Sequence, residues 1–212
     1  MMTNSNLPVP TLLLLAGLGL MPNLSQGGDL IGPFTPPSAT PSPRHFEVCY
    51  NHTCKEVEEL SLTPNQWQQI RDLFLPPAGS AAQEREQIAA AVAHIEVFVG
   101  EKIGTSNEKG GNLQGLSSGG NQFDCIDEST NTTTYLTMME QDGLLRWHKV
   151  EERKTRNLFF FGGWPHTTAV ISEKENGKLW AVDSWFYDNG TPPAILPIDQ
   201  WSDGWKPPGF KG

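Results

Sequence analysis

The hydrophobic periodicity of the chain changes once, at Gly143, and this change restricts the folds open to it. Before Gly143, apolar residues recur at helical spacing in three stretches, at about 64–75, 81–104 and 125–143. After it, short alternating or apolar runs typical of strands occupy 144–150, 158–161, 166–172 and 179–186. Helices followed by strands predict an α+β fold, in which N-terminal helices precede a third helix packed on an antiparallel sheet.

Short signals mark the ends of the predicted helices. Thr63-Pro64 combines a helix cap with a proline at the first helical position, and Pro76-Pro77 ends that helix. Ser80 caps the longer helix, which is expected to end near Gly100 or Gly104.

Two further segments flank these elements. Phe46–Tyr50 predicts an edge strand that turns at Asn51-His52. The proline-rich tail that carries Trp201 and Trp205 is expected to pack across the sheet rather than extend it.

Composition along the chain predicts three parts. Residues 7–20 form an apolar run that is short for a spanning helix, so residues 1–26 are interpreted as an export signal, or as an uncleaved anchor. Residues 27–45 are rich in proline and serine and predict a linker. Residues 46–212 are expected to form a single domain.

Charge restricts the partners. The 212-residue chain has a formal net charge of −9 and no cluster of lysine or arginine, which argues against nucleic acid or an anionic membrane surface as a partner. A protein or peptide substrate fits better, with membrane contact only through the N-terminal segment. No cofactor is predicted, and the oligomeric state stays open.

The three cysteines divide into a pair and a single thiol. Cys49 and Cys54 are close enough for a small disulfide loop in an oxidising compartment, which leaves Cys125 unpaired. A metal site formed by Cys49 and Cys54 with His52 or His45 is the less favoured alternative, because the usual spacing and second ligand pair are missing.

Cys125 falls in the first turn of a predicted helix that opens within Phe123–Thr130. Unpaired backbone N–H groups and the helix dipole favour a thiolate there, as a nucleophilic cysteine requires. Asp124, Asp127 and Glu128 would raise the pKa of the thiol and offset part of that effect. These three acids are expected to be a solvated helix start rather than a metal site.

A histidine and an aspartate on neighbouring predicted strands could complete a triad with Cys125. If the hairpin has the four-residue loop Glu173–Asn176, His166 lies directly opposite Asp183 on one face. A two-residue Asn176-Gly177 turn would instead place Tyr187 opposite His166, and the triad would fail. The longer loop is therefore predicted.

These motifs carry a family resemblance. Asp124-Cys125 at a helix start, Pro165-His166 on a strand and Val182-Asp183 on the next strand resemble the transglutaminase-like branch of the papain-like cysteine hydrolases, including the bacterial transglutaminase-like cysteine proteinases. The similarity covers about residues 115–190.

The resemblance implies a papain-like or transglutaminase-like core and a role for each triad residue. Cys125 would be the nucleophile, His166 the base and then the acid, and Asp183 the group that orients the imidazole. The bacterial proteinases have Asp-Cys-Glu-Asp-Tyr at the nucleophile, whereas this chain has Asp124-Cys125-Ile126-Asp127-Glu128. Substrate and calcium dependence therefore do not carry over.

Further candidates surround this triad. Gln122 and Gln114 are candidates for the oxyanion hole, together with the backbone N–H of Cys125. Three tryptophans could wall a substrate cleft: Trp164, Trp185 and Trp147.

Two functional classes stay open. The first is an exported, periplasmic or secreted cysteine hydrolase that attacks peptide or isopeptide amide bonds by proteolysis, deamidation or acyl transfer. The second is a catalytically inactive relative whose pocket binds a protein or peptide partner. An effector secreted into another cell would have the same sequence features.

Overall fold

The computed structural model describes Met1 and residues 40–111, 122–156 and 165–210. The chain divides into two compact units, Met1–Pro36 and Pro37–Gly212, and the described helices and strands belong to the second. The predicted export segment, most of the linker and the strand predicted at 158–161 lie outside the described residues. None of the described helices combines the length and apolar character needed to cross a membrane.

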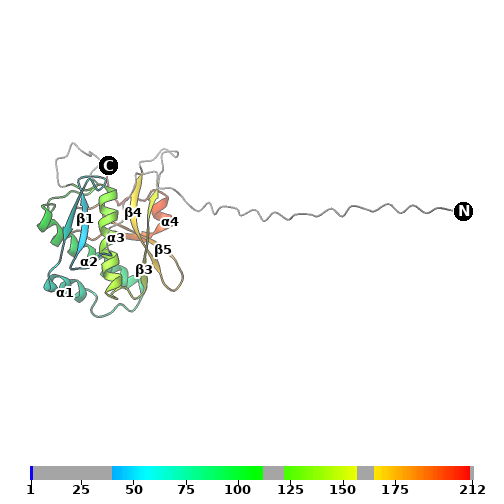
Figure 1. Ribbon diagram of the computed structural model, residues 1–212, viewed down its shortest axis with the longest axis horizontal. Helices are drawn as coiled ribbons and strands as arrows, with labels where there is room; N and C mark the ends of the chain where they lie inside the picture. The colour runs from blue at the N-terminus through cyan, green and yellow to red at the C-terminus, as the bar shows by residue number, and fades with distance from the viewer. Residues whose placement is uncertain (2–39, 112–121, 157–164, 211–212) are drawn as a thin grey trace. The chain divides into compact units, whose positions relative to one another are not determined.

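The second unit is α+β with antiparallel sheets, as Figure 1 shows. A hairpin comes first, formed by β1 (Phe46–Tyr50) and β2 (Glu56–Leu60). Three helices follow: α1 (Pro64–Asp72), α2 (Ala81–Ile103) and α3 (Cys125–Gln141). The remaining elements are β3 (His148–Arg156), β4 (His166–Glu173), β5 (Leu179–Asp183), β6 (Ala194–Pro197) and α4 (Ile198–Ser202).

The three long helices begin at side-chain caps. Thr63 and Asp124 each form a capping box, and the Ser80 hydroxyl accepts the backbone N–H of Gln83. Helix α2 ends at Gly104, whose φ of 76° is the left-handed conformation that glycine adopts without strain. The caps that the sequence offers therefore set the first residue of each helix.

The four-stranded sheet has the order β3-β4-β5-β6, and three sequence predictions about it are wrong. Strand β3 begins at His148 rather than 144 and continues to Arg156, and β5 stops at Asp183 rather than 186. The tail extends the sheet, because β6 pairs with β5. Pro197 is tolerated there since β6 is an edge strand, where the missing N–H costs no ladder bond.

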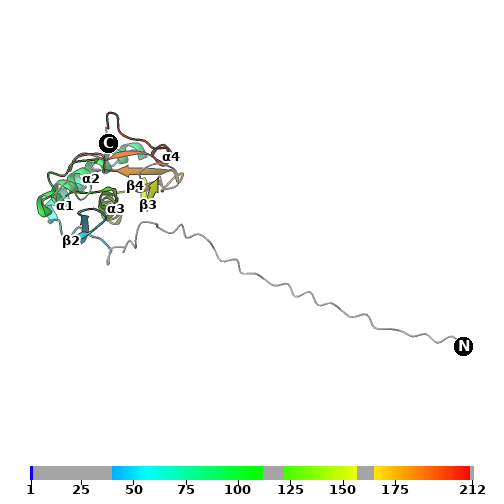
Figure 2. The same ribbon diagram turned by 90° about the horizontal axis from the view of Figure 1, so that it is seen from above.

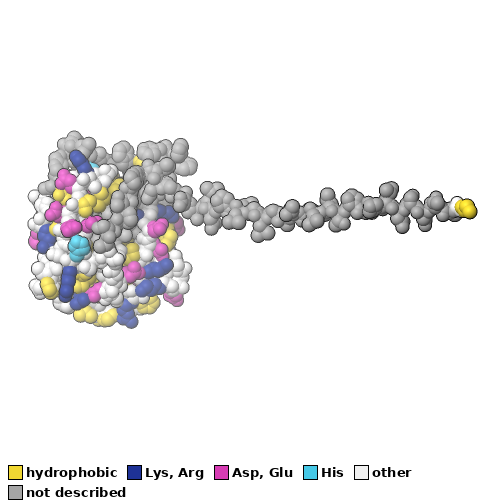
Figure 3. All heavy atoms as spheres, viewed as in Figure 1, with side chains coloured by type: hydrophobic (Ala, Val, Ile, Leu, Met, Phe, Trp, Pro, Cys, Tyr) yellow, Lys and Arg dark blue, Asp and Glu magenta, His cyan; other side chains and the backbone are white. Residues whose placement is uncertain are grey.

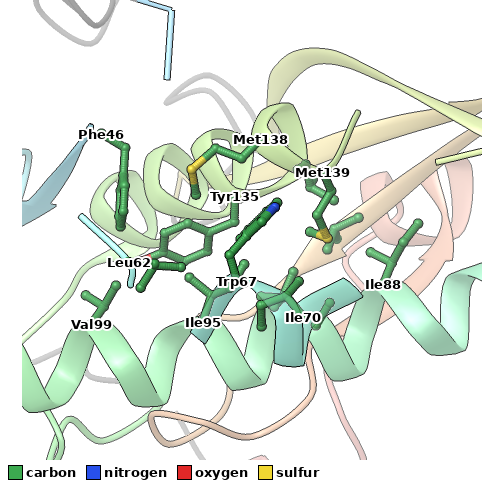
Figure 4. Close-up of a cluster of buried hydrophobic side chains, with 14 of the residues drawn as sticks. Phe46, Leu62, Trp67, Ile70, Ile88, Ile95, Val99, Tyr135, Met138 and Met139 are labelled. Carbon is green, nitrogen blue, oxygen red and sulfur yellow. The ribbon is translucent and has the colours of Figure 1, made fainter. Parts of the chain in front are cut away.

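Helix α3 lies between the two sheets, in contact with β1 on one side and with β3 and β4 on the other (Figures 1 and 2). A large cluster of buried side chains joins α1, α2, α3 and β1 to the sheet. Figure 4 labels ten of its members: Phe46, Leu62, Trp67, Ile70, Ile88, Ile95, Val99, Tyr135, Met138 and Met139.

The two faces of the four-stranded sheet have different neighbours. Val182 belongs to the large cluster beneath α3, whereas Ala181 packs in a smaller cluster with Leu196 and Trp201. Because neighbouring residues of a strand point to opposite faces, α4 covers the face away from α3. On the surface drawn in Figure 3, acidic and basic side chains are interspersed.

Candidate active site

His166 and Asp183 meet on the α4 face of the sheet. The hairpin loop has four residues, as predicted, but it is closed by Glu173 and Lys178, one residue later than expected. The last ladder pair, Ala169 with Val182, places Asp183 beyond it and two residues away from direct opposition to His166. The predicted direct pairing is therefore wrong.

The two side chains nevertheless form a hydrogen bond. His166 Nε2 and Asp183 Oδ2 are 2.7 Å apart, because diagonal neighbours on one face of a sheet stay within reach of long side chains. A shift of two residues also keeps both side chains on the same face, whereas a shift of one would have separated them. The predicted contact between His166 and Asp183 therefore forms, although the predicted register was wrong by two residues.

The second nitrogen of the His166 ring is open. With the Nε2 hydrogen donated to the carboxylate, Nδ1 carries the lone pair of a neutral imidazole. Nδ1 is buried and has no hydrogen-bond partner among the described residues. The ring also lies 4.9 Å from that of Trp185 and 5.1 Å from that of Phe186. An oriented base with an unused nitrogen can accept a proton.

Cys125 is the first residue of α3 and is partly exposed. The backbone N–H of Thr167 lies close enough to its thiol to lower the pKa, so the thiol lies against the backbone of β4 at the residue that follows His166. Burial, together with the charges of Asp124 and Asp183, raises the pKa of Cys125 to about 12, although the N–H of Thr167 opposes the shift. The expected stabilisation of a resting thiolate is therefore wrong: burial outweighs the helix dipole.

A disulfide between Cys49 and Cys54 closes a loop over the start of α3. This disulfide loop, residues 49–54, contains four successive residues in the left-handed region: Asn51, His52, Thr53 and Cys54, with φ of 62°, 63°, 57° and 52°. Such runs are rare for residues with a Cβ. This conformation turns successive backbone N–H groups toward one side, where they can surround an anion.

The anions are side chains next to the thiol. The N–H groups of His52 and Cys54 donate to Asp127 at 2.7 and 2.6 Å, and that of Thr53 donates to Asp124 at 2.9 Å. Both carboxylates also cap α3 itself. The disulfide loop thus fixes the turn that carries Cys125.

The expected solvated helix start is wrong for two of its three acids. Asp127 and Glu128 are buried, because the disulfide loop covers the first and Ser184 donates a hydrogen bond to the second at 2.7 Å. Burial raises the pKa of Asp127 to about 7 and that of Glu128 to about 8. The loop amides and the Ser184 hydroxyl oppose these shifts.

Two more buried carboxyls lie near Glu128. Glu96 and Glu108 are almost fully buried, and burial together with the neighbouring carboxylates raises their pKa values, to about 9 for Glu108. Each has one oxygen without a partner among the described residues. Burial in this part of the core therefore favours the protonated form of both carboxyls.

One group of described side chains could hold a metal ion. Ligand atoms of His52, Asp124 and Asp127 all lie within 4.8 Å of one another. Both carboxylates already accept backbone N–H groups, so only their remaining lone pairs could bind a cation. The alternative metal site at Cys49 and Cys54 is replaced by their disulfide.

The structure adds two residues that the sequence did not single out. Trp201 of α4 donates from Nε1 to Asp183 Oδ2 at 2.6 Å, on the same oxygen that meets His166. Arg156, opposite His166 in the ladder, stacks on the Trp201 ring and is almost fully buried. No local sequence pattern predicts the contact between Arg156 and Trp201, since the two residues are 45 positions apart.

Of the other predicted site residues, one contacts His166, one lies far from it, and two lie outside the described part of the chain. Trp185 contacts His166, and the Gln122 side chain accepts the backbone N–H of Lys109. Trp147 does not belong to this site: its carbonyl bonds Lys174 at the far end of β4, eight residues beyond His166 and roughly 26 Å along the strand. Gln114 and Trp164 lie outside the described residues.

Comparisons of the chain with protein-family models, with curated proteins and with solved structures found no match. A function for this chain therefore has to be inferred from the geometry of the site.

Proposed function

We propose that the protein is an exported cysteine hydrolase or acyltransferase that attacks amide bonds of proteins or peptides with Cys125, His166 and Asp183. One observation carries the proposal: His166 is hydrogen-bonded to Asp183 through Nε2 while its buried Nδ1 is open, and the backbone N–H of Thr167, the residue after His166, lies near the Cys125 thiol. Such a constellation is recognised by its geometry and roles rather than by its fold. The disulfide supports an oxidising compartment.

The raised pKa of Cys125 selects the order of proton transfer. The resting thiol is neutral, so its proton passes to His166 Nδ1 as the sulfur forms a bond to the carbonyl carbon. The imidazolium then gives that proton to the leaving amine as the C–N bond breaks. Water releases the acid from the thioester, or a second amine accepts the acyl group, and the thiol is regenerated.

The arrangement also resembles the transglutaminase-like core, with a nucleophile at a helix start and a histidine and an aspartate on adjacent antiparallel strands. The backbone N–H of Cys125 and the Gln122 side chain are the proposed oxyanion donors. Trp185, which contacts His166, is the proposed cleft residue among the described tryptophans.

An inactive binding module is the second candidate. The observation in its favour is the high pKa of Cys125 together with the lack of a thiol-to-imidazole hydrogen bond in the described part of the chain. In that case the Cys125 thiol would react slowly, and its rate of alkylation would not depend on His166.

The deciding experiment is the pH dependence of iodoacetamide alkylation at Cys125, measured by mass spectrometry on the folded protein. Wild type is compared with His166→Ala and with His94→Ala, a control in which a histidine that contacts Phe98 is removed. Enzyme chemistry predicts that only His166→Ala slows alkylation near neutral pH, by about tenfold or more, because the base is lost. Equal rates in all three proteins would instead support the binding module.

A further inference from the structure

One oxygen of Asp183 accepts two hydrogen bonds from buried donors. His166 Nε2 lies 2.7 Å and Trp201 Nε1 2.6 Å from Oδ2. Asp183 and Trp201 are 1% and 0% exposed, so water does not compete for these bonds. Rotation of the carboxylate would break both contacts, and the two donors together therefore fix its plane.

The indole also restricts the imidazole directly. The rings of His166 and Trp201 have centroids 5.6 Å apart and an interplanar angle of 36°. Trp185 and Phe186 contact the imidazole as well. The catalytic base is thus held by ring packing and by a carboxylate that is itself held by Trp201.

Helix α4 needs outside support to hold Trp201 in place. It has five residues and no side-chain cap, and a helix that short is not stable by itself. Arg156 supplies the support: its guanidinium lies 4.5 Å above the Trp201 ring and donates to the backbone carbonyls of Trp201 and Trp205. Because Arg156 pairs with His166 across the ladder, the strand pair that carries the base also fastens α4.

We infer that Trp201 is a positioning residue, which acts through Asp183 to hold His166 in the orientation that the cysteine chemistry needs, with Arg156 fastening its helix. This inference rests on the proposed function. It assigns a role to the C-terminal segment, which completes the site by a hydrogen bond rather than only covering the sheet.

The test uses Trp201→Phe, which removes the N–H group and keeps an aromatic ring. Trp180→Phe is the matched control, since the Trp180 Nε1 has no partner among the described residues. We expect alkylation of Cys125 near neutral pH to fall about tenfold in Trp201→Phe, because a displaced base loses proton-transfer efficiency, and to stay unchanged in the control. Equal rates in wild type and Trp201→Phe would overturn the inference.

A double-mutant cycle separates positioning from a general structural effect. If Trp201 acts through His166, Trp201→Phe has no further effect on alkylation in a His166→Ala background. The same slowing in both backgrounds would show that the substitution damages the site by another route, and the inference would fall. Arg156→Lys, which keeps the charge and loses the planar guanidinium, is expected to give a smaller slowing of the same kind.

Proton NMR gives a readout that does not depend on reactivity. In a Cys125→Ala protein, the His166 Nε2 proton should give a downfield resonance, identified by its loss in Cys125→Ala/His166→Ala. Adding Trp201→Phe should move or broaden that resonance, and an unchanged signal would contradict the positioning role. If His166→Ala leaves alkylation unchanged, the proposed function fails and the NMR comparison alone decides the role of Trp201.

Discussion

Two buried histidine–carboxylate pairs lie at opposite ends of the β3 and β4 ladder, and they differ in one respect. His148 Nδ1 lies 2.9 Å from Glu84, and His166 Nε2 lies 2.7 Å from Asp183. All four side chains are buried. Burial and a carboxylate partner therefore do not distinguish His166, the proposed base, from His148.

The distinction lies in the second ring nitrogen. Arg85 donates to His148 Nε2. Glu84 also accepts the backbone N–H groups of Arg146, Trp147 and His148. Each ring nitrogen of His148 and both carboxylate oxygens of Glu84 therefore have a partner. The Nδ1 of His166 has no such partner among the described residues. A closed network stabilises the fold, whereas a ring nitrogen without a partner can still accept a proton.

Replacing each histidine by alanine should give the largest difference between the two pairs. We expect His166→Ala to lower the rate of Cys125 acylation by an activated ester about 10³-fold, because the general base is lost. His148→Ala should leave the rate near wild type and lower the free energy of unfolding by about 3 kcal/mol, since a buried carboxylate loses a partner. Acylation is followed by mass spectrometry and unfolding by urea titration. The reverse pattern would exchange the roles assigned to the two pairs.

The carboxylates should divide in the same way. Glu84→Gln places an NH₂ group among backbone N–H donors and should cost about 3 kcal/mol in the free energy of unfolding. Asp183→Asn should cost about 1 kcal/mol, because Oδ1 of the amide can still accept the Trp201 and His166 bonds, yet it should slow acylation. Urea unfolding and acylation are measured on both variants, and a larger stability loss in Asp183→Asn would count against the comparison.

The stability contributed by Glu84 and that contributed by the buried acids near α3 should depend on pH with opposite signs. The hydrogen bonds from His148, Arg146 and Trp147 outweigh burial and hold the pKa of Glu84 below its usual value, so its contribution is present above its unfolded pKa and lost as pH falls through the folded one. The raised pKa values near α3, about 8 for Glu128 and about 9 for Glu108, act in reverse. There the folded state keeps protons that the unfolded chain has released, so stability falls as pH rises from about 5 to about 9.

Glu128→Gln tests this sign. The amide oxygen still accepts the Ser184 hydroxyl, and the variant should flatten the alkaline loss of stability by up to about 1.4 kcal/mol per pH unit. Urea unfolding is measured from pH 5 to 9, with the exposed Glu58→Gln as control. A variant that loses stability with pH as steeply as wild type would exclude Glu128 as a source.

Removal of the disulfide should have a local effect, at the end of the domain where α3 begins. Replacing Cys49 and Cys54 by alanine should lower the free energy of unfolding by about 2 kcal/mol, as expected for a short closed loop. Hydrogen exchange should rise at the amides of Ile126 and Asp127 and stay unchanged at His148, because the loop binds the first turn of α3. Equal increases at both places would mean that the loop stabilises the whole domain instead.

Much of the fold could be predicted from local sequence. The caps at Thr63 and Ser80 and the stop at Gly104 set the bounds of α1 and α2 to within a few residues of the prediction. The sheet was less accessible: the extension of β3 through residues 151–156 is strongly charged and has no clear alternation. Its pairing with the buried strand β4 stabilises it, and that is a non-local effect.

In the candidate site too, contacts within a hairpin could be predicted and contacts made by packing could not. His166 and Asp183 were identified, since their separation already places them on one face of a hairpin whose loop has four residues. The Trp201 contact and the His148 pair were missed, because neither joins the two strands of one predicted hairpin. Nothing in the local pattern of either segment names the partner.

The sequence by itself determined where helices begin, which strand residues share a face, and which cysteine remains single. These properties depend on caps, periodicity and spacing within a few residues. Only the tertiary structure decided that burial raises the pKa of Cys125, that Asp127 and Glu128 are buried, and that Trp201 of α4 bonds Asp183. The physical reason is that pKa values and hydrogen-bond partners depend on burial and on neighbours brought together by packing, which local sequence does not contain.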